Sequence, residues 1–587
     1  MARRSAPKLT PAGELRRLRS YFARHRRDIL IGGLAIPITH AFGLLSPWIL
    51  KGAIEKLERG RFGRALLLDA TAIVLASLAS GVFRYVMRRR LIGASRWIEF
   101  DLRNDLFAHF QRLSPSFYAR YRVGDLMARA TNDLNSVRNM IGPGMMYLAS
   151  TLTVLPAVLV FMVILDPMLT AVAMVPMAGL AILLTRFGSA IHQRSEAVQD
   201  QYAALSAGVQ EAFAGIRVLK SYVREPYEIE RFRRENAAYV AKSMHLVRLS
   251  GLFGPLMTLF TGLAALAVIW IGSLRVIAGR FTLGDFVAFM SYLGMLAWPV
   301  ISLGWVVNMI QRGTASLARI GRILDEEPEL TSGRQLPQSP PGIELRGVTF
   351  GYPGGPLVLK GIDLRIAPGE TVAICGRTGS GKTTLAGLIP RLYDVVSGQV
   401  LVGGVDVREL DLAELRRRIG FVPQETFLFS ATMRQNIAYG FDGADDEAVE
   451  EAADISRILP AIREFPHGFD TLVGERGITL SGGQKQRTAI SRAVIRSPEI
   501  LILDDSLSSV DARTEEEVLS RLRRVLRTRT SILISHRVTT VREADRIVVL
   551  DQGRIAEEGS HANLVARGGL YARMVEQQLL REQLEAS

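Results

Sequence analysis

The sequence TVAICGRTGSGKTT, residues 371–384, decides the fold of the second half of this chain. The apolar segment from Val372 to Cys375 predicts a buried strand, and the pattern LAGLIPRL that follows predicts a helix. Between them lies Gly376-x-x-x-x-Gly381-Lys382-Thr383, a glycine-rich loop in the strand–loop–helix setting of a phosphate-binding loop. The stretch therefore predicts an α/β nucleotide-binding domain built around a P-loop.

The residue types in this loop suit a nucleoside triphosphate bound together with Mg²⁺. Its glycines allow backbone N–H groups to approach phosphate, and the N-terminus of the following helix favours an anion. Lys382 is the only lysine between residues 361 and 484; it is expected to pair with the β- and γ-phosphates, and Thr383 to bind Mg²⁺. The predicted ATP-binding residues of the loop are Gly376, Arg377, Thr378, Gly379, Ser380, Gly381, Lys382, Thr383 and Thr384.

A second apolar strand ends in two acids. In LILDDSLSSVD, residues 501–511, the apolar run leads directly into Asp504 and Asp505. Buried carboxylates are costly unless a cation lies nearby. Because P-loop ATPases hold Mg²⁺ with a carboxylate at the end of such a strand, Asp504 is predicted to bind the metal beside Thr383. The alternative for Asp504 is a strand-end acid that caps a turn.

The first half of the chain is rich in long apolar stretches. Hydrophobic residues make up 48% of the chain, which is high for a soluble protein. Six stretches are long enough to cross a bilayer of roughly 30 Å; they are residues 29–50, 65–86, 140–165, 168–187, 250–279 and 283–310. The first is too long and too far from the start for a signal-peptide core. We expect an all-α transmembrane domain with six spans.

The net charge of +15 is distributed as in a multi-pass membrane protein. Segments 1–27, 88–139 and 186–249 carry nine, ten and ten Arg or Lys residues, whereas the turn at 166–167 carries none. This bias places the N-terminus and the two long loops in the cytoplasm, and six spans would return the chain to the cytoplasm near residue 312. The loop at 51–64, with five basic residues, goes against the rule.

The two long cytoplasmic loops have helical periodicity. WIEFDLRNDLFAHFQRL and EAVQDQYAALSAGVQEAFAGIRVLKSY place apolar residues three and four apart. The spans are therefore expected to continue into the cytoplasm as paired helices that turn near residues 115–124 and 222–229. The alternative is a helical loop without a role of its own.

A linker is predicted between the two halves. Residues 326–342, EEPELTSGRQLPQSPPG, are rich in Pro, Ser and Gly and lack periodicity. This segment separates a transmembrane domain at 1–325 from a nucleotide-binding domain at 343–578, which a C-terminal tail at 579–587 follows.

With these motifs, the second half resembles the nucleotide-binding domain of an ATP-binding cassette (ABC) transporter. The sequence LSGGQ at Leu480–Gln484 is similar to the family signature, and GERG at 474–477 to the segment just before it. Further matches are Gln424 to the Q-loop, Tyr352 to the adenine-stacking aromatic, Asp511 to the D-loop and His536 to the switch histidine. With its six spans, the whole chain resembles a half-transporter of the multidrug, lipid or peptide type. The resemblance implies a type I exporter fold and ATP and Mg²⁺ as cofactors.

The resemblance also implies a role for each matched residue. Tyr352 offers a flat ring to adenine, although a lone Tyr is more often a core or surface residue. His536 would contact the γ-phosphate and the attacking water, although a lone His is more often structural. The predicted catalytic residues are Asp505, His536 and Gln424, and the predicted metal residues are Thr383, Gln424 and Asp504. The other predicted nucleotide-binding residues are Tyr352, Leu480, Ser481, Gly482, Gly483, Gln484 and Asp511.

Asp505 departs from the family pattern, in which the residue after the metal-binding aspartate is usually Glu. Its carboxylate falls roughly 1 Å short, a misplacement that can lower the rate about a hundredfold. The site built on this P-loop is therefore expected to bind ATP and to hydrolyse it slowly. Because LSGGQ is intact, we expect a heterodimer in which another chain supplies the Glu. A homodimer that tolerates Asp505 is the alternative.

The resemblance implies ATP-driven export by alternating access across the bacterial plasma membrane, with a second half-transporter and the bilayer as partners and no nucleic acid. The cargo is expected to be amphipathic or hydrophobic (a drug, a lipid or a peptide), because no span carries several charges. Candidate cavity residues are His40, Trp270, Met290, Tyr292, Met295, Trp298 and Asn308, although packing or lipid contact explains each equally well. Two further classes stay open, a channel-like ABC protein gated by ATP and a soluble nucleic-acid ATPase.

Overall fold

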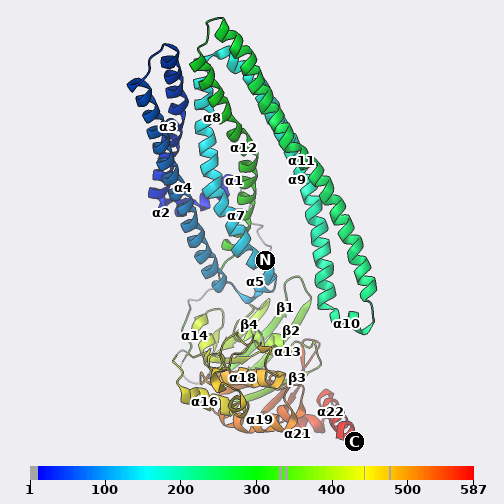
Figure 1. Cartoon of the computed structure of the whole chain (residues 1–587). Coiled ribbons are helices and arrows are strands. Elements are labelled where there is room, and N and C mark those ends of the chain that lie inside the picture. The colour runs from blue at the N-terminus through cyan, green and yellow to red at the C-terminus, as the bar shows by residue number, and fades with distance from the viewer. Residues whose placement is uncertain (1–10, 329–332, 338–340, 442, 475–476, 587) are drawn as a thin grey trace. The chain divides into compact units, whose positions relative to one another are not determined.

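The computed structural model describes residues 11–328, 333–337, 341–441, 443–474 and 477–586. The chain divides into two compact units (Figure 1), of which the first is Met1–Gln111 with Arg122–Glu327 and the second is Arg112–Tyr121 with Pro328–Ser587. The division at Glu327 falls within the predicted linker, parts of which, 329–332 and 338–340, lie outside the described residues. The domain bounds drawn from the sequence remain predictions.

Long helices make up the first unit. In chain order they are α1 (Pro11–Arg17), α2 (Arg19–Arg24), α3 (Arg26–Glu58), α4 (Arg64–Arg112), α6 (Val123–Ala128), α7 (Leu134–Asn139), α8 (Met145–Leu165), α9 (Pro167–Ala214), α10 (Ile216–Ser221), α11 (Glu225–Ile277) and α12 (Leu283–Leu324). Two π-helical turns, η1 (Arg129–Asp133) and η2 (Met140–Gly144), join α6, α7 and α8. The short helix α5 (Pro115–Tyr118) follows α4 and belongs to the second unit.

Five helices within the described residues are long and apolar enough to cross a membrane; they are Arg26–Glu58, Arg64–Arg112, Val123–Leu165, Pro167–Ala214 and Glu225–Ile277. They overlap the first five predicted spans. The sixth predicted span, 283–310, lies in α12, which carries a shorter apolar segment, Leu283–Leu296. A count of six spans therefore remains a prediction, and each apolar stretch is part of a longer helix than its hydropathy indicates.

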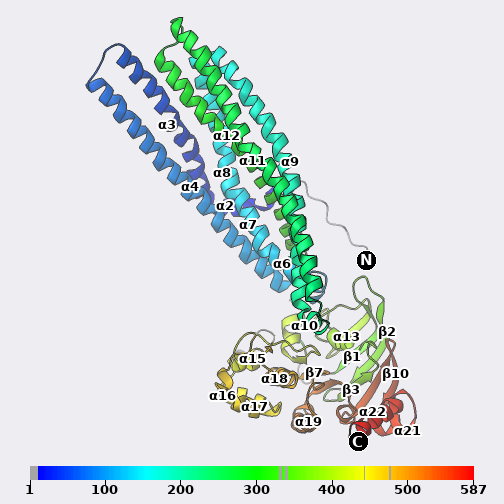
Figure 2. The same ribbon diagram turned by 45° about the vertical axis from the view of Figure 1, so that its right-hand side comes forward.

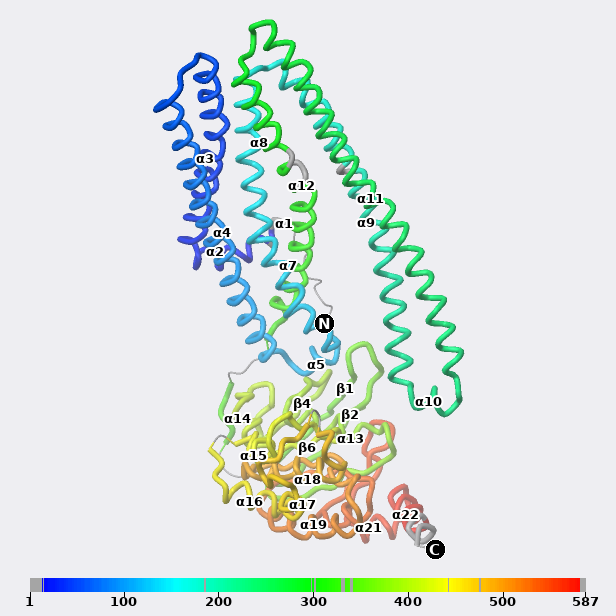
Figure 3. The backbone as a smooth tube through the Cα atoms, viewed as in Figure 1, coloured from blue at the N-terminus to red at the C-terminus, as the bar shows by residue number. Residues whose placement is uncertain are grey.

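The helices α9 and α11 form one long antiparallel hairpin that turns at α10. They lie side by side in both views (Figures 1 and 2), and Figure 1 shows them diverging from α8 and α12 toward the α10 end. The tube in Figure 3 follows the same path through teal and green. A groove between the two helices is lined by Tyr202, Phe213 and Phe232, all three of which are exposed. Near the turn, Tyr222 and Val223 are also exposed.

The core of the first unit lies where α8, α9, α11 and α12 meet. Val158, Leu169, Val268 and Phe289 are fully buried there. Tyr292 is buried with them, and its hydroxyl donates to the carbonyl oxygen of Leu44 over 2.8 Å. Within this chain, Tyr292 therefore packs between helices and is closed off from solvent, whereas a cavity residue would need an open face.

The other candidate cavity residues are less enclosed. Trp270 and Trp298 are exposed, and His40, Met290, Met295 and Asn308 are half-buried. The imidazole Nε2 of His40 is buried without a hydrogen-bond partner among the described residues. These positions neither establish nor exclude a cavity role, which stays a prediction.

The second unit contains two sheets. The strands β1 (Ile343–Gly351), β2 (Leu357–Ile366), β4 (Ser397–Val402) and β5 (Val405–Asp406) pair antiparallel in the order β2-β1-β4-β5. The other sheet has the order β10-β9-β3-β8-β7-β6. Its strands are β3 (Thr371–Gly376), β6 (Ile419–Val422), β7 (Ile500–Asp504), β8 (Thr530–Ile534), β9 (Arg546–Asp551) and β10 (Arg554–Gly559). Pairing is parallel from β9 to β6, and the edge strand β10 is antiparallel.

Helices complete the second unit. They are α13 (Lys382–Leu388), α14 (Leu412–Arg417), α15 (Met433–Ala438), α16 (Asp446–Ile455), α17 (Leu459–Glu464), α18 (Gly482–Val494), α19 (Ala512–Leu526), α20 (Val538–Val541), α21 (His561–Ala566) and α22 (Leu570–Ala586), with a 3₁₀ turn η3 (Gly468–Asp470). The helix α22 runs across the predicted boundary between the domain and its tail at residue 578.

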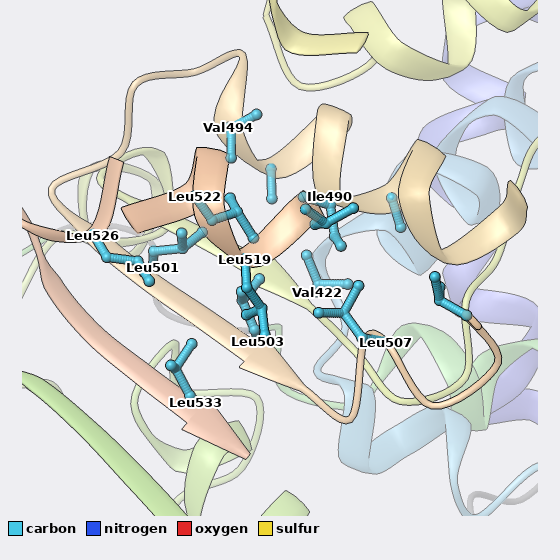
Figure 4. Packing of buried hydrophobic residues seen from close by; sticks show 14 of the residues in the cluster. Val422, Ile490, Val494, Leu501, Leu503, Leu507, Leu519, Leu522, Leu526 and Leu533 are labelled. Carbon is cyan, nitrogen blue, oxygen red and sulfur yellow. The ribbon is translucent and has the colours of Figure 1, made fainter. Parts of the chain in front are cut away.

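Alternation along β7 builds two cores at once. Leu501 and Leu503 lie in one buried cluster with Ile490 of α18 and Leu522 of α19 (Figure 4). The intervening residues of β7, including Ile502, face the opposite side of the sheet. There they belong to a second buried cluster that also contains residues of the antiparallel sheet. A strand that is buried on both faces needs continuous apolar sequence, which explains why residues 500–503 lack the polar alternation of a half-exposed strand.

Candidate nucleotide site

The P-loop leaves the C-terminal end of β3, which is buried along its length. Gly376 has a φ of +147°, and a Cβ there would lie 2.1 Å from the carbonyl oxygen of Leu550. Gly381 has a φ of +101°, and a Cβ there would lie 2.7 Å from Leu359. Both positions therefore require glycine because of the backbone conformation and because of the close neighbour.

Lys382 is the first residue of α13 and is buried. Its ammonium group donates to the carbonyl oxygens of Gly376 and Arg377, at 3.0 Å each. Burial lowers the pKa of Lys382, while the nearby charges of Asp504 and Asp505 oppose that shift. The lysine thus closes the loop on itself and holds its charge where a phosphate would lie.

Asp504 ends β7 and is only 1% exposed. Burial raises the pKa of Asp504 above its ordinary value; the Thr383 hydroxyl and the Lys382 charge oppose the shift, and Asp505 adds to it. The hydroxyl therefore lies close by, yet neither carboxylate oxygen of Asp504 has a hydrogen bond of normal geometry among the described residues.

An orphaned, buried carboxylate beside a hydroxyl is the kind of oxygen donor set that Mg²⁺ accepts. No group of three or more His, Cys, Asp or Glu side chains suited to a metal occurs in the part of the chain that the structure describes. A small donor set fits Mg²⁺, which usually takes its remaining ligands from phosphate and water. Asp504 and Thr383 would hold the ion.

Asp505 follows in the left-handed region, with a φ of +45°. Its N–H donates to the carbonyl oxygen of Ile534 over 2.8 Å, and its own carbonyl accepts from the Ser508 hydroxyl over 2.9 Å. Its carboxylate lies within electrostatic range of Lys382 and His536. The peptide is thus fixed from both sides, and the side chain is near the residues with which it is predicted to act.

His536 and Gln424 approach the same edge of the sheet. His536 follows β8, and Gln424 follows β6; both side chains are exposed. Although the side chain of His536 reaches solvent, the protein around its ring removes part of the ring's hydration; this and then the Lys382 charge lower the pKa of His536, and Asp505 opposes them. Because β3, β8, β7 and β6 are parallel neighbours, their C-terminal ends meet at one edge, where ligands bind in open α/β sheets.

The signature sequence forms the start of α18. Ser481 caps this helix by accepting from the Gln484 N–H over 3.3 Å, while the Gln484 side chain accepts from the Ser481 N–H over 2.9 Å. Leu480 is buried before the cap, and a Cβ at Gly483 would lie 3.0 Å from the carbonyl oxygen of Ser509. This reciprocal cap fixes the helix N-terminus at which an anion would bind.

Tyr352 lies just after β1, and 37% of the residue's surface is exposed. The ring packs edge-on against Phe350 and Tyr393, and its hydroxyl is 3.1 Å from the Thr384 hydroxyl.

Two further predicted motifs lie farther along the chain. Asp511 caps α19 by accepting from the Thr514 N–H, a hydrogen bond that lowers the pKa of Asp511. Within GERG, residues 475–476 lie outside the described residues.

Two residues that the sequence analysis did not single out hold this site together. Gln486 and Arg537 both bind the segment that follows Asp505. Each lies next to a predicted site residue, Gln486 two positions after Gln484 and Arg537 directly after His536. Their positions in the sequence were the available signal, but nothing in one sequence distinguishes a structural polar residue from a solvated one.

Comparison with protein families gives two matches. Residues 29–300 match the ABC transporter transmembrane region, and residues 359–508 match the ABC transporter domain. The chain belongs to the ABC transporter family. It carries one transmembrane region and one ATP-binding domain and is a multi-pass membrane protein whose ATP hydrolysis is coupled to transport.

Individual relatives cover nearly all of the chain. A probable multidrug resistance ABC transporter ATP-binding/permease protein of Bacillus subtilis is 36% identical over 96% of this chain and 96% of its own length. An ATP-dependent lipid A-core flippase of Syntrophus aciditrophicus is 37% identical over 90% of this chain and 88% of its own. A solved bacterial Atm1-family ABC exporter with ATP bound has a TM-score of 0.79 and 30% identity, covering 94% of this chain and 99% of that one. This ABC transporter therefore has the type I exporter fold. Its membership of this family excludes the soluble nucleic-acid ATPase.

Proposed function

We propose that this ABC transporter exports amphipathic or hydrophobic substrates (drugs, lipids or peptides) from the cytoplasm by alternating access, as one half of a heterodimer with one slow and one competent ATP site. The observation that carries the proposal is Asp505, which occupies the position of the catalytic carboxylate in a site that is otherwise complete. The names of the relatives, which concern multidrug resistance and a lipid A-core flippase, support this class of cargo.

Asp505 has an advantage in conformation and a disadvantage in reach. Its φ of +45° lies in a region that Asp and Asn adopt several-fold more readily than other non-glycine residues. A Glu at this position would be placed less comfortably but would extend its carboxylate roughly 1 Å further, and such a distance can change a rate about a hundredfold. The residue therefore suits a site that binds ATP and hydrolyses it slowly.

The other residues keep their capacity to bind nucleotide. Lys382 has three donors, which can exchange the carbonyl oxygens of Gly376 and Arg377 for phosphate oxygens. Asp504 and Thr383 would hold Mg²⁺, which neutralises charge that develops on the phosphates. His536, whose pKa burial and the Lys382 charge lower, can donate a ring N–H to a γ-phosphate oxygen.

This chain has an intact signature sequence but a shortened catalytic carboxylate, which is consistent with two different chains supplying the parts of one competent ATP site. Ser481 and the first N–H groups of α18 can bind an anion at the start of this helix. We propose that this capacity does not serve the slow site built on this chain's own P-loop. We propose that this helix start completes a competent site whose P-loop and Glu come from the partner. In a homodimer, by contrast, both sites would depend on Asp505.

We propose an inner-membrane location in a bacterium, with six spans and both termini in the cytoplasm. The helices that run past the apolar spans then lie in the cytoplasm and end near the predicted turns at 115–124, which contains α5, and 222–229, which follows α10. We propose that these two turns couple the ATP-binding domains to the membrane helices. The grouping of Arg112–Tyr121 with the second unit supports such a role for α5. The other turn, at 222–229, is proposed to dock on the partner's ATP-binding domain.

The test compares three variants in two assemblies. The chain is purified alone and with the half-transporter encoded beside it, and ATP turnover is measured for wild type, Asp505→Glu and Asp505→Asn. The proposal expects turnover only with the partner, a severalfold or larger gain from Asp505→Glu, and little further loss from Asp505→Asn. Brisk turnover by the chain alone, abolished by Asp505→Asn, would establish the homodimer instead.

Transport needs its own measurement. Inside-out vesicles that contain the active assembly receive ATP and a fluorescent amphiphile in the external medium, and accumulation of the amphiphile inside the vesicles is followed against the Lys382→Ala variant. ATP-dependent uptake supports export. ATP-dependent conductance without accumulation would support the channel-like alternative.

A further inference from the structure

The segment Ser506–Asp511 connects the end of the Asp505 strand to α19, and its backbone is held by side chains from two other elements. One is Gln486, in the second turn of α18 behind the signature. The other is Arg537, which follows His536. The segment is therefore bound by the signature helix, through Gln486, and by Arg537, the residue next to the switch histidine.

Gln486 is 5% exposed and uses both ends of its amide. Its Oε1 accepts from the Ser509 N–H over 2.9 Å, and its Nε2 donates to the Ser508 hydroxyl over 2.9 Å. That hydroxyl in turn donates to the Asp505 carbonyl oxygen over 2.9 Å. The signature helix is thereby connected, through two hydrogen bonds, to the peptide that carries Asp505.

Arg537 binds the same segment through its guanidinium fork. Its Nη1 donates to the Val510 carbonyl oxygen over 3.0 Å, and its Nη2 donates to the Ser508 carbonyl oxygen over 3.2 Å. The same group pairs with the Glu515 carboxylate on α19. The Glu515 side chain is only 3% exposed, and it also accepts from the Thr540 hydroxyl over 2.5 Å. Arg537 is thus anchored to a buried acid while it reaches two carbonyl oxygens.

We infer that Arg537 is a positioning residue that couples His536 to the Asp505 peptide and, through Gln486, to the signature helix. Because His536 and Arg537 are adjacent, a displacement of His536 when it meets a γ-phosphate moves the fork that holds Ser508 and Val510. Gln486 passes that displacement to α18 and hence to Ser481. This inference goes beyond the proposed function, since it applies to a homodimer as well as to a heterodimer.

The chemistry requires arginine. A planar guanidinium can donate to two carbonyl oxygens and a carboxylate at fixed angles, whereas a lysine ammonium is a point charge on a flexible stem. Arg537→Lys can still neutralise Glu515, and so avoids leaving a buried acid without a partner. It cannot hold both carbonyl oxygens in the same geometry. This variant therefore separates positioning from simple charge balance.

The test uses the full chain in whichever assembly hydrolyses ATP. Arg537→Lys is expected to lower kcat about tenfold or more while ATP binding changes less than about twofold, since the P-loop is untouched. The matched control is Arg523→Lys, which alters an arginine of α19 paired with Glu543 at the surface. It is expected to leave kcat and ATP binding unchanged. Wild-type turnover in Arg537→Lys, or a loss of ATP binding equal to the loss of kcat, would overturn the inference.

A second variant, at Gln486, tests the same coupling without changing Arg537, whose replacement could also affect folding. Gln486→Asn keeps the amide but shortens it, so it should also lower kcat at unchanged ATP binding. If both residues act on Ser508, the double variant should lose less than the product of the two single losses. Independent, multiplicative losses would contradict the coupling. Because these ratios are taken within one assembly, they do not depend on how the Asp505→Glu comparison turns out.

Discussion

The Lys382 ammonium group donates to the carbonyl oxygen of Gly376, six residues earlier in the same loop, over 3.0 Å. A second donor goes to Arg377, so the lysine shapes the P-loop from within. Asp504, although close enough to influence the pKa of Lys382, keeps two carboxylate oxygens without hydrogen bonds among the described residues. The P-loop is therefore already shaped by Lys382, while the buried charge of Asp504 has no hydrogen-bonding partner in the described part of the chain.

Asp504→Asn should stabilise the nucleotide-free protein. It removes a buried carboxylate that has no hydrogen bond of normal geometry, and even 1 kcal/mol would raise the melting temperature by about 2–4 °C for a domain of this size. Differential scanning fluorimetry without nucleotide checks this. The added stabilisation from ATP with Mg²⁺ over ATP alone should vanish in the variant. A lower melting temperature in the nucleotide-free variant would show that Asp504 has a structural partner.

The same carboxylate predicts a pH dependence. The pKa of Asp504 is raised in the folded protein above the ordinary value of 3.8, so the folded state binds a proton more tightly than the unfolded chain. The contribution of Asp504 to stability should therefore improve as pH falls through the folded pKa toward 3.8. Melting curves of wild type and Asp504→Asn should converge as pH falls, and a difference independent of pH would contradict this.

Tyr352→Ala should weaken ATP binding about tenfold, since stacking on a base contributes about 1–3 kcal/mol. Tyr352→Phe keeps the ring and its packing against Phe350 and loses only the contact with the Thr384 hydroxyl, so it should bind almost as wild type does. Equilibrium titration with a fluorescent ATP analogue measures both. Equal losses in the two variants would assign the effect to the hydroxyl.

Gly483→Ala should reduce turnover by more than tenfold, with ATP still bound by this chain's P-loop. A Cβ at residue 483 would lie 3.0 Å from the backbone oxygen of Ser509, which is tight and hard to relieve. Gly559→Ala is the matched control, because its nearest neighbour would be at an ordinary 3.5 Å and its φ is not positive. Steady-state ATPase assays compare the two. Equal activity of both variants would mean that the segment at Ser509 can shift.

Gly284→Ala should destabilise the first unit. A Cβ at this position in α12 would lie 2.6 Å from the backbone oxygen of Lys51, beside the ion pair that joins the Lys51 ammonium to Asp285 over 2.6 Å. Gly294→Ala, in the same helix, meets nothing within 4 Å. Thermal unfolding in detergent should show a loss for Gly284→Ala alone. If both variants lose equally, helix propensity and not packing sets the effect.

The nucleotide site could be predicted from the sequence because its parts are local. Gly376 to Thr384 forms one turn between a strand and a helix, and the acids at 504 and 505 end a continuous apolar strand. Parallel pairing then brings β3, β6, β7 and β8 to one edge, a relation that the fold class already implies.

Contacts between distant segments could not be predicted. Hydropathy marked 65–86 and the periodicity of residues 97–113 predicted that the helix continues, but neither pattern shows that Arg64–Arg112 is one unbroken helix. In the same way, Tyr292 has a residue type that suits a cavity, yet its hydroxyl bonds to Leu44 and is enclosed. The fork of Arg537 depends on a contact with Val510, 27 positions away, that no local pattern encodes.

The groove on the α9–α11 hairpin has a consequence for how cells handle this protein. Its aromatic side chains, Tyr202, Phe213 and Phe232, stay open to solvent in the single chain. Apolar surface of this kind is stable only when another molecule covers it, and otherwise favours aggregation. In the proposed heterodimer, the lifetime of the newly made subunit should therefore depend on the supply of the other chain, with unassembled copies cleared by proteases in proportion to their excess.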